Sequence, residues 1–100
     1  MRHERPYQPR EGDKIIVDKN EIKILKSYRG GIVELEHRIP ESVISIRLKT
    51  SLSEYLERLT PEMPNIRNNI QYERKILSGL LGTRVRRLKL SEGKLVEVSS

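Results

Sequence analysis

The chain contains no cysteine, alanine, phenylalanine or tryptophan among its 100 residues. Without cysteine there is no disulfide, no thiolate metal site and no cysteine nucleophile, and we expect a cytoplasmic protein. Long apolar runs are also missing. The longest is Ile15-Ile16-Val17, whereas a membrane-spanning helix needs about 20 such residues. We therefore expect no membrane association and no signal peptide.

The apolar residues that are present are almost all aliphatic. Apart from four tyrosines and two methionines, each one is isoleucine, leucine or valine. Branched side chains suit a pleated sheet, and a chain of this length forms a single domain with one core. Charged residues make up 34% of the chain. Together with the few glutamines, this composition is typical of proteins from thermophiles.

Alternation of apolar and polar residues predicts strands in four segments, namely 14–17, 21–28, 32–37 and 43–49. Gly30-Gly31 separates the second segment from the third, and glycine supplies the positive φ that a hairpin turn requires. The last segment alternates most strictly. Its apolar residues, which we expect to face the core, are Ile44, Ile46 and Leu48.

The period changes after residue 50, and two helices are expected. Ser51 and Glu54 have the spacing of a capping box, and a helix beginning there ends before Pro61. A second helix is expected to begin at Pro64 or Asn65 and to end near Gly82. Its apolar residues at helical spacing are Ile66, Ile70, Leu77 and Leu81.

Residues 84–90 and 94–98 are expected to form a C-terminal hairpin around a loop that contains Gly93. The alternative is that the second helix continues through 84–90. The predicted fold is therefore an α+β domain, with a small antiparallel sheet (a meander of three or four strands plus the hairpin) and two helices packed on one face. It spans residues 14–100, and residues 1–13 are expected to be a flexible N-terminal arm.

The formal net charge is +6, and the excess lies in one stretch of the sequence. Residues 64–90 contain Glu73 as their only acidic residue. The basic residues of that stretch are Arg67, Arg74, Lys75, Arg84, Arg86, Arg87 and Lys89. Clustered arginine and lysine bind phosphate and release counterions. Tyr72 lies in the same stretch and is a candidate for stacking on a base.

The charge distribution predicts a small, non-catalytic nucleic-acid-associated protein. Its basic C-terminal half would bind the phosphate backbone of DNA or RNA. The alternative is an accessory or protein-interaction subunit of a transcription, replication or ribosomal complex, including a homodimer formed through the last strand. That function would use an exposed apolar strip, with Leu88, Leu90, Leu95 and Val96 as its residues. A basic face that is merely solvated is the third interpretation.

Catalysis is not expected, because the residues for it are sparse. The histidines are His3 and His37 alone, and no metal-binding spacing such as HExxH occurs. No phosphate-binding loop or nucleophile elbow is present. Glu34 and Glu36 are expected to form ion pairs with lysines of the neighbouring strand. The sequence therefore predicts no metal and no cofactor.

Overall fold

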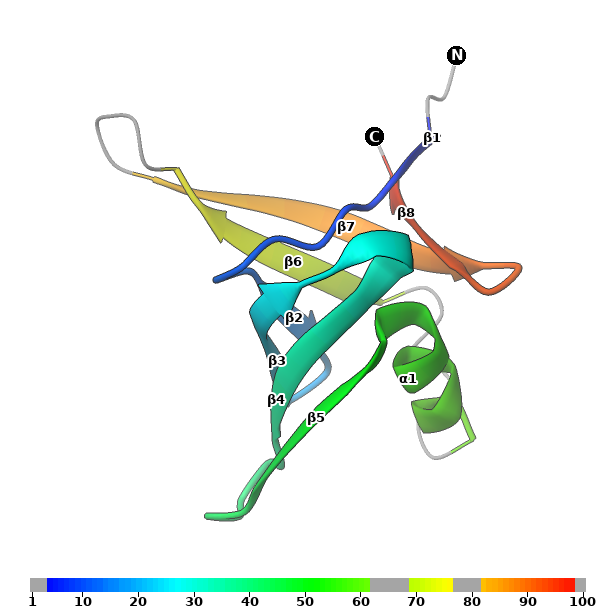
Figure 1. Cartoon of the computed structure of the whole chain (residues 1–100). Helices are drawn as coiled ribbons and strands as arrows, with labels where there is room; N and C mark the ends of the chain where they lie inside the picture. Colours follow the sequence, from blue (N-terminus) through cyan, green and yellow to red (C-terminus); the bar gives the residue numbers. More distant parts are fainter. Residues whose placement is uncertain (1–3, 62–68, 77–81, 99–100) are drawn as a thin grey trace.

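Eight antiparallel strands form one curled sheet in the computed structural model, which describes residues 4–61, 69–76 and 82–98 (Figure 1). In chain order the elements are β1 (Glu4–Pro6), β2 (Lys14–Val17), β3 (Asn20–Ser27), the 3-10 turn η1 (Arg29–Gly31), β4 (Ile32–Arg38), β5 (Ser45–Ser51), α1 (Leu52–Leu59), β6 (Ile70–Lys75), β7 (Thr83–Ser91) and β8 (Lys94–Val98). The strand order is β1-β8-β7-β6-β2-β3-β4-β5. The sheet is a half-barrel whose two edges are β1 and β5.

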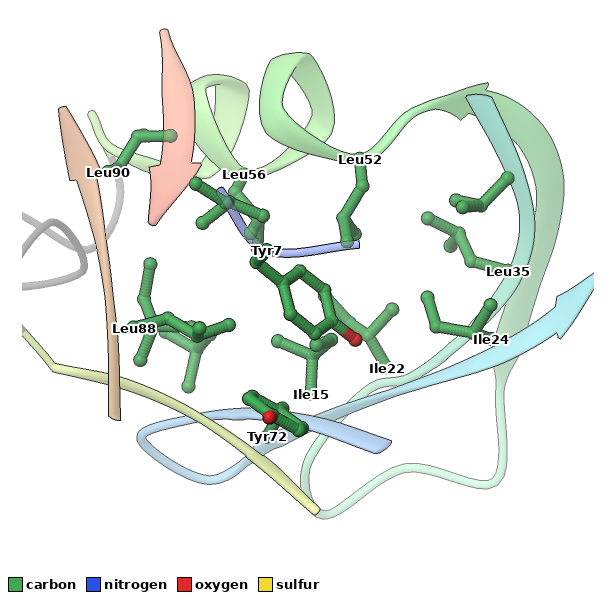
Figure 2. Close-up of a cluster of buried hydrophobic side chains, with 14 residues drawn as sticks. Tyr7, Ile15, Ile22, Ile24, Leu35, Leu52, Leu56, Tyr72, Leu88 and Leu90 are labelled. Atoms are coloured by element: carbon green, nitrogen blue, oxygen red, sulfur yellow. The ribbon is translucent and has the colours of Figure 1, made fainter. Parts of the chain in front are cut away.

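The core fills the inside of the half-barrel. Figure 2 shows the side chains of the strands and of α1 pointing toward one another there. The buried apolar residues are Tyr7, Ile15, Val17, Ile22, Ile24, Val33, Leu35, Leu52, Leu56, Ile70, Tyr72, Leu88, Leu90 and Leu95. The rings of Tyr7 and Tyr72 are tilted against each other with their centroids 4.8 Å apart. The core therefore combines aliphatic side chains with one tyrosine pair.

The predicted α+β class is wrong, and the predicted second helix is the main error. Ile70–Lys75 forms strand β6, which pairs with β2 on one side and β7 on the other. Ile70 and Tyr72 are both buried, as a two-residue period requires. The helical interpretation linked Ile70 to Leu77 at a spacing of seven and gave Tyr72 no place in the core. The remaining parts of the proposed helix, 64–68 and 77–81, lie outside the described residues.

The expected burial of the 43–49 segment is also wrong. Ile44 and Ile46 are 60% and 42% exposed, and only Leu48 packs against the core. The reason is that β5 is an edge strand, and nothing in the described chain covers this end of its inner face. Alternation identifies the two faces of a strand but does not show whether a second layer covers one of them.

Two local predictions are confirmed. α1 covers Leu52–Leu59, and the Ser51 hydroxyl accepts a hydrogen bond from the Glu54 backbone N–H at 3.5 Å. β7 and β8 form the C-terminal hairpin, so the helical alternative for 84–90 is excluded. Its two-residue turn is Glu92-Gly93, and both residues have positive φ (50° and 76°). This is the conformation of a type I′ hairpin turn.

The N-terminal residues that the structure describes take part in the sheet and the core. β1 pairs with β8, and the Tyr7 N–H continues the ladder by donating to the Leu95 carbonyl oxygen at 2.9 Å. β8 pairs with β1 on one side and with β7 on the other. The predicted homodimer through the last strand would need a free edge on β8, and the described part of β8 does not offer one. The apolar strip proposed beside it is not exposed either. Leu88, Leu90 and Leu95 are buried, and Val96 is half-buried.

Candidate nucleic-acid interface

The ends of β6 and β7 extend past their neighbours as a two-stranded ribbon. β2 pairs with β6 only as far as Glu73, and the described part of β8 pairs with β7 only from Arg87 onward. Beyond those points β6 and β7 pair with each other, and the Ile76 N–H donates to the Gly82 carbonyl oxygen at 3.0 Å. Figure 1 shows the two strands running outward together, away from the rest of the sheet. We call residues 74–76 and 82–87 the ribbon.

The ribbon carries exposed cations on both faces. Arg84 and Arg86 lie on the face of β7 that carries buried Leu88, because side chains two apart share a face. Arg87 lies on the opposite face of β7. Lys75 lies on the same face as Arg87. Gln71 shares the face of Arg87 because the two are cross-strand partners, and Lys75 shares the face of Gln71 because it follows it by four residues, an even number, on β6. All four basic side chains are exposed, and none of them forms an ion pair with a described residue.

Arg74, also predicted to bind phosphate, is held by the protein itself. Its Nε donates to Asp13 Oδ1 at 3.0 Å, and its Nη2 donates to Asp13 Oδ2 at 2.8 Å and to the Gln8 carbonyl oxygen at 2.9 Å. The hydrogen bond to Asp13 raises the pKa of Arg74 further. Arg74 therefore anchors residues 8–13 to β6.

The other predicted contact residues are placed differently. Tyr72 is buried, and its hydroxyl donates to Glu97 Oε1 at 2.5 Å. Its pKa is raised, chiefly by burial, and its ring is not available for stacking on a base. Lys89 lies on the outer face at the base of the ribbon and is half-buried. Arg67 lies outside the described residues. The structure thus brings together Lys75, Arg84, Arg86 and Arg87 of the predicted set.

Charges of both signs alternate across the outer face of β3, β4 and β5, whereas the described residues of the ribbon include no acidic side chain. Glu34 stands between Lys26 and Lys49 in the strand register, and Glu36 stands between Lys23 and Arg47. The closest of these contacts joins Arg47 Nη2 to Glu36 Oε2 at 3.2 Å. The register places Lys26 and Lys23 opposite the two glutamates as expected, but the side-chain partner of Glu36 is Arg47 and that of Glu34 is the Tyr28 hydroxyl. Each of these four cations therefore has a glutamate as its strand neighbour, whereas Lys75, Arg84, Arg86 and Arg87 have no acidic cross-strand partner among the described residues.

A groove of about 460 Å³ on the outer face adjoins the ribbon, and the sequence interpretation missed it. Its basic lining residues are Lys14, Lys23, Arg38 and Lys75, and its acidic ones are Glu21 and Glu36. Lys14 and Lys23 are directly opposite each other on β2 and β3. Glutamates flank this pair, because Lys14 is opposite Glu73 and lies 4.0 Å from Glu21, and Lys23 is opposite Glu36. The two-residue turn Asp18-Lys19 sets this register. Recognising that turn in the sequence would have been enough to predict that Lys14 and Lys23 are cross-strand partners.

No protein-family model, curated protein or solved structure matches this chain. In the part of the chain that the structure describes, no helix is long and apolar enough to cross a membrane, and no cluster of side chains has the composition of a metal site.

His37, the one histidine among the described residues, has a structural environment. Its Nε2–H donates to Asn20 Oδ1 at 2.8 Å, and its Nδ1 accepts from the Tyr55 hydroxyl at 2.6 Å. Asn20 Oδ1 can only accept, so the proton of the neutral ring is on Nε2. The ring is buried, and burial lowers the pKa of His37. These contacts join β3, β4 and α1.

The lowered pKa of His37 predicts a loss of stability at mildly acidic pH. The unfolded chain takes up a proton on this ring near pH 6.5, whereas the folded protein does so only at lower pH. The free energy of unfolding should therefore fall as the pH drops below about 6.5, because protonation favours the unfolded state. Urea titrations of the wild type and of His37→Gln from pH 8 to pH 5 test this. The His37→Gln variant should lack this part of the pH dependence, and parallel pH profiles would contradict the assignment.

Proposed function

We propose that the protein binds double-stranded DNA through the ribbon, with no catalytic role. The observation that carries this proposal is the placement of Arg84 and Arg86 on one face of a projecting two-stranded ribbon and of Arg87 and Lys75 on the other. The major groove of B-form DNA admits a two-stranded β-ribbon. Such a ribbon has a phosphate backbone on each side of it, so basic side chains on both faces have partners.

Duplex DNA is favoured over other nucleic acids on two grounds. The major groove of A-form RNA is too deep and narrow for side chains to read. Binding of single strands uses aromatic rings as stacking platforms, and the described residues of the ribbon include no aromatic side chain. The arginines also suit phosphate, because a guanidinium group donates two parallel hydrogen bonds to it. The groove that includes Lys14 and Lys23 would receive phosphates that flank the ribbon.

Neutralising the ribbon should abolish most of this binding. In the variant Arg84→Gln/Arg86→Gln/Arg87→Gln, we expect at least a tenfold loss of affinity for a 20-base-pair duplex at low salt. Each phosphate contact contributes about 0.9 to the slope of log K against log salt. The slope should therefore become shallower by about 3 in the triple variant. Fluorescence anisotropy with duplex DNA, single-stranded DNA and duplex RNA at several salt concentrations measures both quantities.

The matched control removes the same charge elsewhere. Arg29, Arg58 and Lys94 are exposed and lie outside the ribbon and the groove, so their triple glutamine variant has the same net charge as the ribbon variant. We expect it to keep an affinity within about threefold of the wild type. An equal loss in both variants would show that net charge alone drives retention, and no binding by the wild type at low salt would reject the proposal outright.

A further inference from the structure

The exposed edge of β5 forms a second surface, separated from the ribbon by β2, β3 and β4 in the sheet order. β5 ends the sheet, so its outward N–H and C=O groups have no described strand to pair with. Val43 is fully exposed, and Ile44 and Ile46 are 60% and 42% exposed. In Figure 1, α1 lies beside the second half of β5, and the first half projects beyond the helix. An open edge with adjacent exposed aliphatic residues is a template for another strand.

The two cations of β5 already have partners within the protein, Arg47 on β4 and Lys49 at Tyr28. Arg47 is paired with Glu36 at 3.2 Å. Lys49 is opposite Glu34, and its Nζ lies 4.0 Å from the centre of the Tyr28 ring. Edge strands that avoid association commonly use free lysines for that purpose. In this protein Arg47 has an anionic partner and Lys49 an aromatic one, so neither cation of β5 is unpartnered.

We propose that β5 pairs antiparallel with β5 of a second copy of this chain, about a two-fold axis at Ile46. In this register Ile46 is opposite Ile46 of the second copy. Ile44 immediately precedes β5 and continues the ladder by accepting from the Ile39 N–H, so it would lie opposite Leu48 at both ends and extend the inner-face aliphatic row. On the outer face Arg47 is opposite Ser45, and Lys49 would lie beside the turn that precedes β5 in the second copy, next to Val43. Cross-strand aliphatic pairs stabilise a sheet, and opposed like charges destabilise it.

The other symmetric registers are less favourable. An axis at Arg47 places the two Arg47 side chains opposite each other, and an axis at Leu48 places Arg47 opposite Lys49 twice. An axis at Ser45 leaves Leu48 opposite Ser42. The Ile46 register therefore avoids opposed cations and covers both Ile44 and Ile46. The result is a sheet that is continuous across two copies, and its formation does not depend on DNA binding.

The oligomeric state tests the proposal directly. Light scattering coupled to size exclusion should give the dimer mass for the wild type at 100 µM. Ile46→Lys should give the monomer mass, because the axis would bring two ammonium groups together. Val85→Lys is the control, since Val85 is an equally exposed β-branched residue on the ribbon, and it should remain dimeric. A wild type that is monomeric at this concentration, or a dimer that both variants leave intact, would overturn the proposal.

The absence of cysteine from the chain makes the register testable as well. Ile46→Cys should form a covalent dimer on mild oxidation, since the two residues are directly opposite across the axis. Ser45→Cys and Arg47→Cys should each cross-link poorly alone and well when mixed. Val85→Cys is the control for random collision. Equal cross-linking of Ile46→Cys and Val85→Cys, or better cross-linking of Arg47→Cys alone than of the mixture, would reject this register.

Discussion

Replacing Asp13 by alanine should lower the free energy of unfolding by about 3–5 kcal/mol, the usual cost of removing one partner from a buried ion pair. Asp13 is 1% exposed and is surrounded by donors. It accepts from the Tyr7 hydroxyl at 2.7 Å, the Arg10 backbone N–H at 3.1 Å, and two nitrogens of Arg74. Alanine would leave the Arg74 guanidinium partly buried without a counter-charge and the Tyr7 hydroxyl without its acceptor.

The effect is large because Asp13 joins parts of the chain that are distant in sequence. Arg74 follows it by 61 residues and belongs to β6. Tyr7 packs on Tyr72, and burial together with the Asp13 hydrogen bond raises the pKa of Tyr7. Loss of the carboxylate therefore loosens the N-terminal segment from the core as well as breaking an ion pair.

Urea denaturation of Asp13→Ala at pH 7 measures the change. Glu36→Ala is the matched control, because it breaks the exposed ion pair with Arg47 and should cost no more than about 1 kcal/mol. Asp13→Asn keeps an acceptor for Tyr7 but loses the charge, so its stability should lie between those of the wild type and Asp13→Ala. A cost for Asp13→Ala equal to that of Glu36→Ala would show that the cluster is solvated and contributes little.

The parts of the fold that were predicted correctly rest on local signals. Strands in the first half follow from two-residue alternation, α1 from the Ser51 capping box, and the last hairpin from Gly93. Each of these signals is contained within about ten residues. β6 lacked such a signal, since Ile70 and Tyr72 supply a single repeat of the strand period. Its pairing with β2 joins residues more than fifty positions apart, and such long-range pairing overrides local propensity.

Only part of the geometry of the candidate site could be predicted from the sequence. The charge count located the basic stretch, and the structure brings four of its members onto the ribbon. Which cations are free depends on tertiary contacts. Arg74 and Arg84 are cross-strand partners, yet only Arg74 lies within reach of Asp13. Tyr72 was expected on the surface because it stands among charged residues, whereas its two-residue spacing from Ile70 places it in the core.

Replacing Leu56 by alanine should destabilise the protein by about 2–5 kcal/mol, the range for deleting a fully buried leucine side chain. Leu56 is 0% exposed. Figure 2 shows it directed with Leu52 from α1 into the cluster around Tyr7. Alanine is the better helix former, so the loss cannot come from helix propensity. It comes from the apolar contacts removed and the cavity left in the half-barrel.

The same variant tests whether α1 holds its place only by packing. An eight-residue helix is too short to be stable alone in water, so its order depends on the side chains that it buries. Leu59→Ala is the control, because Leu59 is only partly buried on the same helix and should cost about half as much or less. Hydrogen exchange of the α1 amides should accelerate far more in Leu56→Ala than in Leu59→Ala. Equal costs and equal exchange in the two variants would mean that the helix does not depend on Leu56 to close the half-barrel.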